Sequence, residues 1–216
     1  MSFEIEVESG KTVKLTTAGK YCDRDILVTA TGYTENDLQM EYNIGYSNGR
    51  IDEETAFLEG LPGCKEIDAD VSSIAPYALA GKSGLETIRL TSLKTSLGGS
   101  AFRECEQLKE VHLPKYASDS NGYFFAKCGK LAFVDFGSPA CVSRYAFQDC
   151  AALKTIILRK NGVVPLNNSN AFSGVSGVTI YVPSEVIGKY KGAANWAGLV
   201  SAGKVTFAEL KGSGYE

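Results

Sequence analysis

Cysteine and histidine can form a nucleophile and base pair, and both occur in the stretch SAFRECEQLKEVHLP at 100–114. Cys105 would be the nucleophile, and His112, the single histidine among the 216 residues, would be its base. Such a pair must come within hydrogen-bonding distance. Whether these two can do so depends on the direction in which each side chain points, and therefore on the element that carries them.

The stretch around this pair is repeated along the chain. AFRECEQLKEVHLP (101–114) matches AFQDCAALKTIILR (146–159), and both FFAKCGKLAFVDFG (124–137) and ALAGKSGLETIRLT (78–91) fit the same frame. Each copy contains one large apolar residue, here called its anchor. The anchors are 22 to 25 residues apart and are Phe57, Leu79, Phe102, Phe125, Phe147 and Phe172. A fixed period of this length is typical of a solenoid.

Each copy also contains a Leu-x-x-apolar-x-Leu pattern, for example Leu108, Val111 and Leu113. The last two apolar positions are two apart, so they share one face of a short strand, and the residues between them face solvent. One coil cannot bury its own apolar face, whereas stacked coils form parallel strands over a continuous core. The predicted core residues are Phe102, Cys105, Leu108, Phe125, Cys128, Leu131, Phe147, Cys150 and Leu153.

The pattern I-x-x-x-A-F-x-x-C-x-x-L-x-x-I-x-L-P resembles the bacterial BspA-like leucine-rich repeat family. It is most complete in LGGSAFRECEQLKEVHLP and VSRYAFQDCAALKTIILR, and the resemblance covers about residues 50–183. It departs from the pattern at Lys82 and Val175, which stand where Cys is expected, and at Gly63, which stands at the Leu position of the first copy. Two inserted loops, 114–123 and 159–170, also depart from it. The resemblance implies an α/β-type repeat solenoid, a right-handed leucine-rich repeat coil with short parallel strands on its concave face. It also implies adhesion or surface binding.

The ends of the array should be covered, because open ends expose core edges. Residues 1–32 predict a β-meander module, 33–49 a connector, 50–183 five to six repeats, and 184–216 a helical cap. In the cap we expect a helix over 185–192 with Ser184 as its N-cap, inward residues Val186, Ile187 and Tyr190, Trp196 sealing the last coil, and a closing strand at 204–210. The N-terminal module is similar to β modules of phage-tail and surface structural proteins, which implies attachment to a larger assembly.

Three of the six cysteines occupy one repeat position, three residues after the anchor: Cys105, Cys128 and Cys150. This predicts a small, buried, apolar side chain at a tight interior corner. Cys22, Cys64 and Cys141 lie outside this frame, and no partner for them follows from the sequence. With one histidine, a His-based metal cluster is not expected, and no cofactor is expected because the glycine-rich segments fit no phosphate-binding loop.

The charge and composition of the chain limit the kinds of partner that it is expected to bind. A formal charge of −3 and a pI near 5.4 argue against a nucleic-acid partner, because no excess of basic residues is available to neutralise phosphates. No apolar run reaches the roughly 18–20 residues that span a bilayer. The N-terminus has no signal-peptide pattern, while the resemblance favours an extracellular, cell-surface or virion-associated protein.

The repeat pattern separates the possible nucleophile from its base, because it places Cys105 in the core and His112 at an outward strand position. We therefore expect no enzyme, and we predict ligand-binding residues in two columns on the concave face: Thr87, Glu110, Phe133 and Thr155 in one, and Arg89, His112, Asp135, Ile157 and Tyr181 in the other. Outward aromatic and apolar residues are typical of protein interfaces. They could instead pack against an insertion or a neighbouring chain. The favoured function is a non-catalytic interaction or adhesion module for a protein or glycan ligand, and the alternative is a structural spacer in a phage tail or cell-surface assembly.

Overall fold

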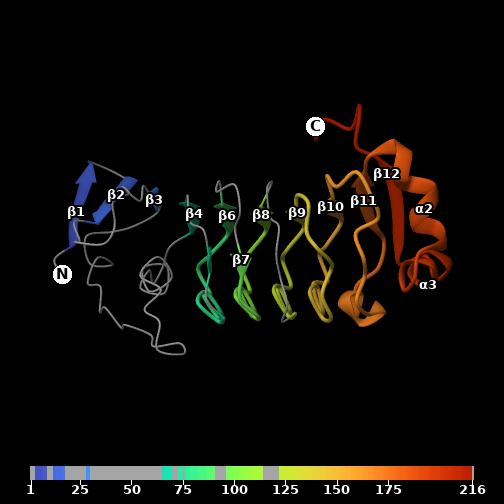
Figure 1. Cartoon of the computed structure of the whole chain (residues 1–216). Coiled ribbons are helices and arrows are strands. Elements are labelled where there is room, and N and C mark those ends of the chain that lie inside the picture. The colour runs from blue at the N-terminus through green and yellow to red at the C-terminus, as the bar shows by residue number, and fades with distance from the viewer. Residues whose placement is uncertain are drawn as a thin grey trace.

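The computed structural model describes residues 3–8, 12–17, 28–29, 65–69, 73–74, 76–90, 96–113 and 122–215. Stacked coils each contribute one short strand to a single open sheet, and the turns of the coils line up on the opposite side (Figure 1). The predicted connector at 33–49 and the copy around Phe57 lie outside the described residues, as do Cys22 and Cys64.

The sheet has eight strands in the order β12-β11-β10-β9-β8-β6-β4-β3. From β4 to β12 neighbouring strands are parallel, whereas β3 is antiparallel to β4. The strands are β3 (Val28–Thr29), β4 (Glu66–Ala69), β6 (Thr87–Leu90), β8 (Glu110–His112), β9 (Phe133–Asp135), β10 (Thr155–Ile157), β11 (Val178–Val182) and β12 (Val205–Glu209).

Two further pairings accompany this sheet. Strands β1 (Phe3–Glu8) and β2 (Thr12–Thr17) form an antiparallel pair. Strands β5 (Ser73–Ile74) and β7 (Ser96–Leu97) form a short parallel ladder beside the turns, and a parallel bridge between Val142 and Leu166 occupies the equivalent place further along. The coils are therefore joined by backbone hydrogen bonds on more than one side.

The core lies between the sheet and the turns and runs through all the described coils. Val111 pairs in register with Ile88 and Val134, and all three side chains are buried. All nine residues that the repeat predicts for the core are buried as well. A core that is shared in this way explains why each coil needs its neighbours.

The anchor rings form a continuous aromatic row along the axis of the solenoid. The ring centroids of Phe102 and Phe125 are 5.4 Å apart, those of Phe125 and Phe147 5.7 Å, and those of Phe147 and Phe172 5.5 Å. Trp196 continues the row at 5.7 Å from Phe172. Each such pair contributes about 0.5–1.5 kcal/mol beyond the burial of its area, so the row joins successive coils directly.

The turns have left-handed backbone two residues after each described anchor and, except at Phe172, two residues before it as well. After the anchors, the residues with positive φ are Gly81 (71°), Glu104 (62°), Lys127 (64°), Asp149 (57°) and Gly174 (74°). The N–H of Lys127 donates to the carbonyl of Gln148 in the next coil at 2.7 Å, and that of Gly81 donates to Arg103 at 2.8 Å. The left-handed turn thus serves hydrogen bonding between coils, although a side chain there is strained.

A cap of helical segments closes the end of the array at β12 (Figure 1). It consists of the 3-10 turn η3 (Ser184–Val186) and the helices α2 (Ile187–Gly192) and α3 (Trp196–Ser201). Val186 and Tyr190 are buried and Ile187 is half-buried. The ring of Tyr190 stacks on Phe207 of β12 at 4.4 Å, so the cap packs directly on the last strand.

Two features of the cap differ from the sequence prediction. Ser184 is not an N-cap, because it lies inside η3, whose own N-cap is Pro183 without a side-chain hydrogen bond. Helix α3 was not predicted. It begins at Trp196, which takes the place that the next anchor would have in the core, so the helix completes the row of anchors.

The insertion at 159–170 is part of the structure that holds the cap. The backbone N–H of Val164 donates to the Tyr190 hydroxyl at 2.9 Å, and the indole N–H of Trp196 donates to the Val164 carbonyl at 2.8 Å. The side-chain amide of Asn195 donates to the Leu166 carbonyl at 2.7 Å. Because its backbone groups are satisfied by cap side chains, this insertion is a docking surface within the chain.

We predict that Lys127→Gly stabilises the protein and that Gly81→Ala destabilises it, each by about 1 kcal/mol. Glycine removes the left-handed strain at 127, and alanine introduces it at 81, where no heavy atom stands within 4 Å of the added Cβ. The exposed ion pair between Lys127 and Glu104 contributes little. Urea unfolding of both variants measures the changes, and a loss of stability in Lys127→Gly would contradict the role of strain.

Candidate functional site

The repeat-position cysteines form a row of buried thiols. The Cys105 thiol donates to the Leu79 carbonyl (3.0 Å), that of Cys128 to Phe102 (3.1 Å), and that of Cys150 to Phe125 (2.9 Å). Each acceptor is the anchor of the preceding coil. The repeat pattern predicts a small apolar side chain at this position but not the hydrogen bond, which is a second reason for cysteine there.

Two of these thiols, those of Cys128 and Cys150, are held in the protonated form. Burial raises the pKa of Cys150 to about 12. The neighbouring Cys105 thiol, together with burial, raises the pKa of Cys128 far above its usual range. The thiolate is the nucleophilic form of cysteine, so these side chains act as hydrogen-bond donors of the core. In the described part of the chain no disulfide joins the cysteines, and Cys141, outside the row, accepts from the side-chain amide of Asn167 at 3.3 Å.

The structure separates Cys105 from His112, as the repeat frame predicts. His112 lies on the other side of the sheet, with Nε2 3.5 Å from a carboxylate oxygen of Glu110 and its ring 5.1 Å from that of Phe133. Among the described residues, no group of three or more His, Cys, Asp and Glu side chains comes together as metal ligands would. None of the helices in the described part has the length and apolar character that crossing a membrane requires.

A pocket of about 360 Å³ opens between the insertion at 159–170 and the cap. It is lined by Arg159, Asn161, Pro183, Ser184, Glu185, Leu210 and Lys211. Glu185 is its single carboxylate, so this pocket lacks the pair of carboxyl groups with which glycosidases work. The residues predicted for ligand binding lie elsewhere, on the face of the sheet that points away from the core, here called the outer face.

The two predicted columns are present on the outer face in exact strand register. Glu110 pairs with Thr87 and Phe133, and Thr155 follows Phe133. In the second column His112 pairs with Arg89 and Asp135, and Ile157 pairs with Asp135 and Tyr181. Thr179 and Thr206 extend the first column beyond Thr155.

Exposure differs along these columns. At the β6–β8 end Arg89, Glu110 and His112 remain partly or fully exposed, and the ion pair between Arg89 and Glu66 is long at 3.9 Å. The predicted exposure is wrong for three residues, because Thr87 is 8%, Asp135 6% and Ile157 1% exposed. The outer face is therefore open at the polar side chains of Arg89, Glu110 and His112, although Thr87 beside them is buried, and it is more covered at Asp135 and Ile157.

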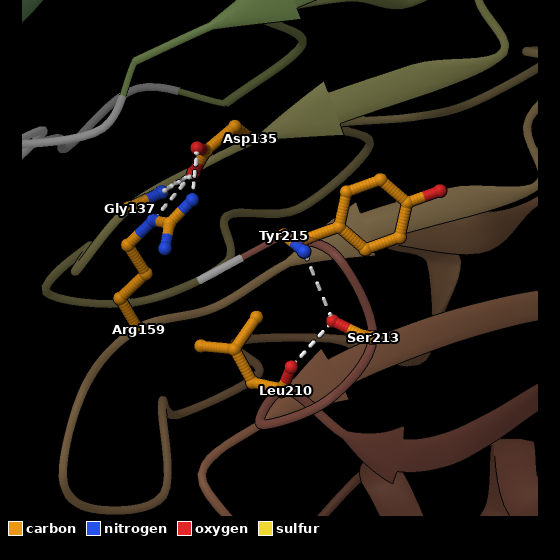
Figure 2. A network of polar contacts seen from close by, with 6 residues as sticks. All are labelled: Asp135, Gly137, Arg159, Leu210, Ser213 and Tyr215. Carbon is orange, nitrogen blue, oxygen red and sulfur yellow. Dashed lines mark hydrogen bonds and ion pairs between the residues drawn. The ribbon is translucent and has the colours of Figure 1, made fainter.

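Asp135 is covered because it is the centre of a clamp (Figure 2). Its carboxylate accepts from Nε and an Nη of Arg159, at 3.3 and 2.7 Å, and from the backbone N–H of Gly137 at 3.1 Å. Arg159 begins the insertion that carries the cap. The Asp135 carboxylate therefore holds the start of the insertion at 159–170 in place.

The aromatic residues of the outer face, Phe133 and Tyr181, are half-buried and are partly covered by the chain itself. The ring of Tyr215 lies 5.6 Å from that of Phe133 and 5.1 Å from that of Tyr181. The sequence leaves packing of these residues against an insertion or a neighbouring chain open, and the repeat pattern does not point to this C-terminal segment. The signal that could have found it is the run Gly212-Ser213-Gly214-Tyr215, a turn followed by an aromatic residue, directly after the predicted closing strand.

A second aromatic row lies on the turns. Tyr77, Tyr123 and Tyr145 occupy the position two residues before their anchors, all with positive φ. Tyr123 and Tyr145 are stacked at 4.6 Å, Ser100 interrupts the row, and Tyr77 is 62% exposed. These rings lie on the side of the coils opposite the sheet.

Coils of this length, with one parallel strand each and a leucine-lined core, define a leucine-rich repeat protein. More specifically, the chain belongs to the BspA type leucine-rich repeat family, because the model of the BspA type leucine rich repeat region (6 copies) matches residues 70–191, more than half of the chain. No curated protein and no solved structure matches the chain. The match begins after the N-terminal segment, so the similarity of that segment to phage-tail modules stays a prediction.

We expect the buried thiol of Cys150 to make stability fall at alkaline pH. The folded-state pKa of Cys150 lies above its ordinary value of about 9, so its contribution is complete below pH 9 and is lost as the pH rises toward about 12. Urea unfolding between pH 7 and 11 should show a shallower decline for Cys150→Ser than for the parent protein. Cys150→Ala should show the same shallow decline as Cys150→Ser. Its free energy of unfolding at pH 7 should be about 1 kcal/mol lower than that of Cys150→Ser, because alanine has no donor for the Phe125 carbonyl. A decline as steep as that of the parent would contradict this assignment.

Proposed function

We propose that this chain is a non-catalytic interaction or adhesion module that binds a protein or glycan ligand on its outer face. The observation that carries the proposal is the pair of in-register columns, whose side chains the core does not use. Arg89, Glu110 and His112 stand partly or fully exposed at one end, and Phe133 and Tyr181 stand at the other. Solenoids use such extended faces for recognition.

Charge and chemistry support a polar ligand segment at the β6–β8 end. Arg89 is loosely paired with Glu66, and His112 is close to Glu110, so the end presents both signs of charge within two columns. Partly exposed, loosely held charges of this kind can exchange their partners for ligand groups at low cost, because exposed ion pairs contribute little. The aromatic end supplies the apolar contact area that interfaces favour.

The family supports a place outside the cell. We propose an extracellular, cell-surface or virion-associated location, with the N-terminal β segment attaching the solenoid to a larger assembly. A structural spacer is the alternative, in which the coils set a distance and the outer face binds nothing.

We predict that Arg89→Ala together with His112→Ala weakens ligand binding about tenfold or more, since a few residues carry most of the binding energy of an interface. Arrays of glycans and of surface proteins provide the ligand, and biolayer interferometry measures its affinity. The melting temperature should stay close to that of the parent, because both side chains lie outside the core.

Lys130→Ala is the matched control, because Lys130 is an exposed basic residue that lies in the turn before β9. Its ammonium group donates to the side-chain carbonyl of Gln107 at 2.6 Å. The affinity of Lys130→Ala should equal that of the parent. Equal affinity in the double variant as well would contradict binding on the outer face. Absence of any ligand, together with self-assembly in light scattering, would favour the spacer.

A further inference from the structure

The segment after β12 turns back over the outer face. The N–H of Leu210 donates to the Val182 carbonyl at 2.9 Å, and that of Ser213 donates to the Leu210 carbonyl at 3.1 Å, which closes a turn. Gly212 and Gly214, on either side of Ser213, have φ of 79° and 85°. Such angles favour glycine, so the reversal is encoded in the residues of the segment.

Ser213 fixes the direction in which the segment leaves the turn (Figure 2). Its hydroxyl donates to the Leu210 carbonyl, and the N–H of Tyr215 donates to the Ser213 hydroxyl oxygen at 3.2 Å. These contacts direct the Tyr215 side chain onto the sheet. Residues 210–215, here called the strap, therefore place one aromatic ring on the outer face.

The ring of Tyr215 occupies a slot between two aromatic walls. It makes a T-shaped contact with Tyr181 (interplanar angle 66°) and a tilted contact with Phe133 (47°). Phe133 is on β9 and Tyr181 is on β11, so a ring that contacts both crosses β10, which lies between them in the sheet. Ile157 of β10 points outward and is nevertheless 1% exposed, which this crossing explains.

The composition of the slot defines what it accepts. The two aromatic walls are Phe133 and Tyr181, and the aliphatic Ile157 lies between them. These residues favour a flat aromatic side chain, which can make edge and tilted contacts with both walls. The charged neighbour Asp135 is already neutralised by Arg159. Beyond Phe133, the open polar end begins at His112, whose ring is 5.1 Å from that of Phe133.

We propose that the slot is a recognition site for an exposed aromatic side chain of a partner polypeptide, and that Tyr215 closes it in cis until that partner displaces the strap. The strap shows the ligand chemistry, because it is a polypeptide segment that presents a tyrosine to the slot. The proposal rests on the proposed function, because the partner is a ligand of the outer face.

Displacement sets a requirement on the partner. A tethered group competes at an effective concentration in the millimolar range, so a single aromatic contact from a partner in solution does not replace Tyr215. The partner must make further contacts next to the slot. Arg89, Glu110 and His112 lie along the same columns and supply them.

The test uses Tyr215→Ala, which empties the slot, and an N-acetylated peptide of residues 211–216 (KGSGYE) as the probe. His112 is the single histidine in the chain, so its imidazole protons give one set of NMR signals next to the slot, to be followed together with the amides of Thr155–Ile157. We expect saturable shifts with Tyr215→Ala and at least tenfold weaker binding to the parent. The peptide KGSGAE should give no shifts.

Two further variants keep the result interpretable. Tyr215→Phe should exclude the peptide as the parent does, because the ring remains. Tyr181→Ala in the Tyr215→Ala background should lose peptide binding, while its circular dichroism spectrum shows that the coils are folded. Equal binding to the parent and to Tyr215→Ala, no binding to either, or equal shifts from KGSGAE would overturn the slot.

The slot and the proposed function can fail separately. Failure of the peptide to bind Tyr215→Ala overturns the slot, while the effect of the Arg89 and His112 substitutions on the ligand remains. If those substitutions have no effect, the proposed function is overturned even though the peptide binds. When both hold, Tyr215→Ala should also raise the affinity for the outer-face ligand about tenfold.

Discussion

Stacking of apolar faces between neighbouring coils is the interaction on which the rest of the structure depends. A coil of about 23 residues cannot enclose a core alone, so each anchor ring packs against the ring of the next coil. This contact is repeated along the array in the row of rings from Phe102 to Phe172, and Trp196 is the last ring of the row. The parallel strand register follows, because anchors at a fixed spacing bring equivalent residues of successive coils side by side.

The separation of inward from outward positions explains which side chains are available for binding. Residues at inward positions, including the thiol donors such as Cys128, serve contacts between coils. Residues at outward strand positions are not used by the core and can form a recognition surface, of which one end is open. The other end carries the insertion and the strap, which return to the outer face through Asp135 and through Phe133.

The repeat could be predicted from the sequence because it depends on local spacing: the coils, the strand positions and the two columns all follow from anchors such as Phe102 and Phe125. Three properties could not be predicted from that spacing. The burial of Asp135 and Ile157 depends on segments from elsewhere in the chain, which no repeat pattern describes. Helix α3 follows the last repeat, so no repeat pattern describes it, although Trp196, Leu199 and Val200 have the i, i+3, i+4 spacing of a helix that packs one face on the core.

The central claim is that inward positions determine stability while outward positions are available for binding, and two phenylalanines of the same coil test it most directly. Phe125 is the anchor and Phe133 is on the outer face. Urea unfolding should show a loss of about 3–5 kcal/mol for Phe125→Ala and of about 1 kcal/mol or less for Phe133→Ala, which loses surface contacts only. Equal losses in the two variants would contradict the account.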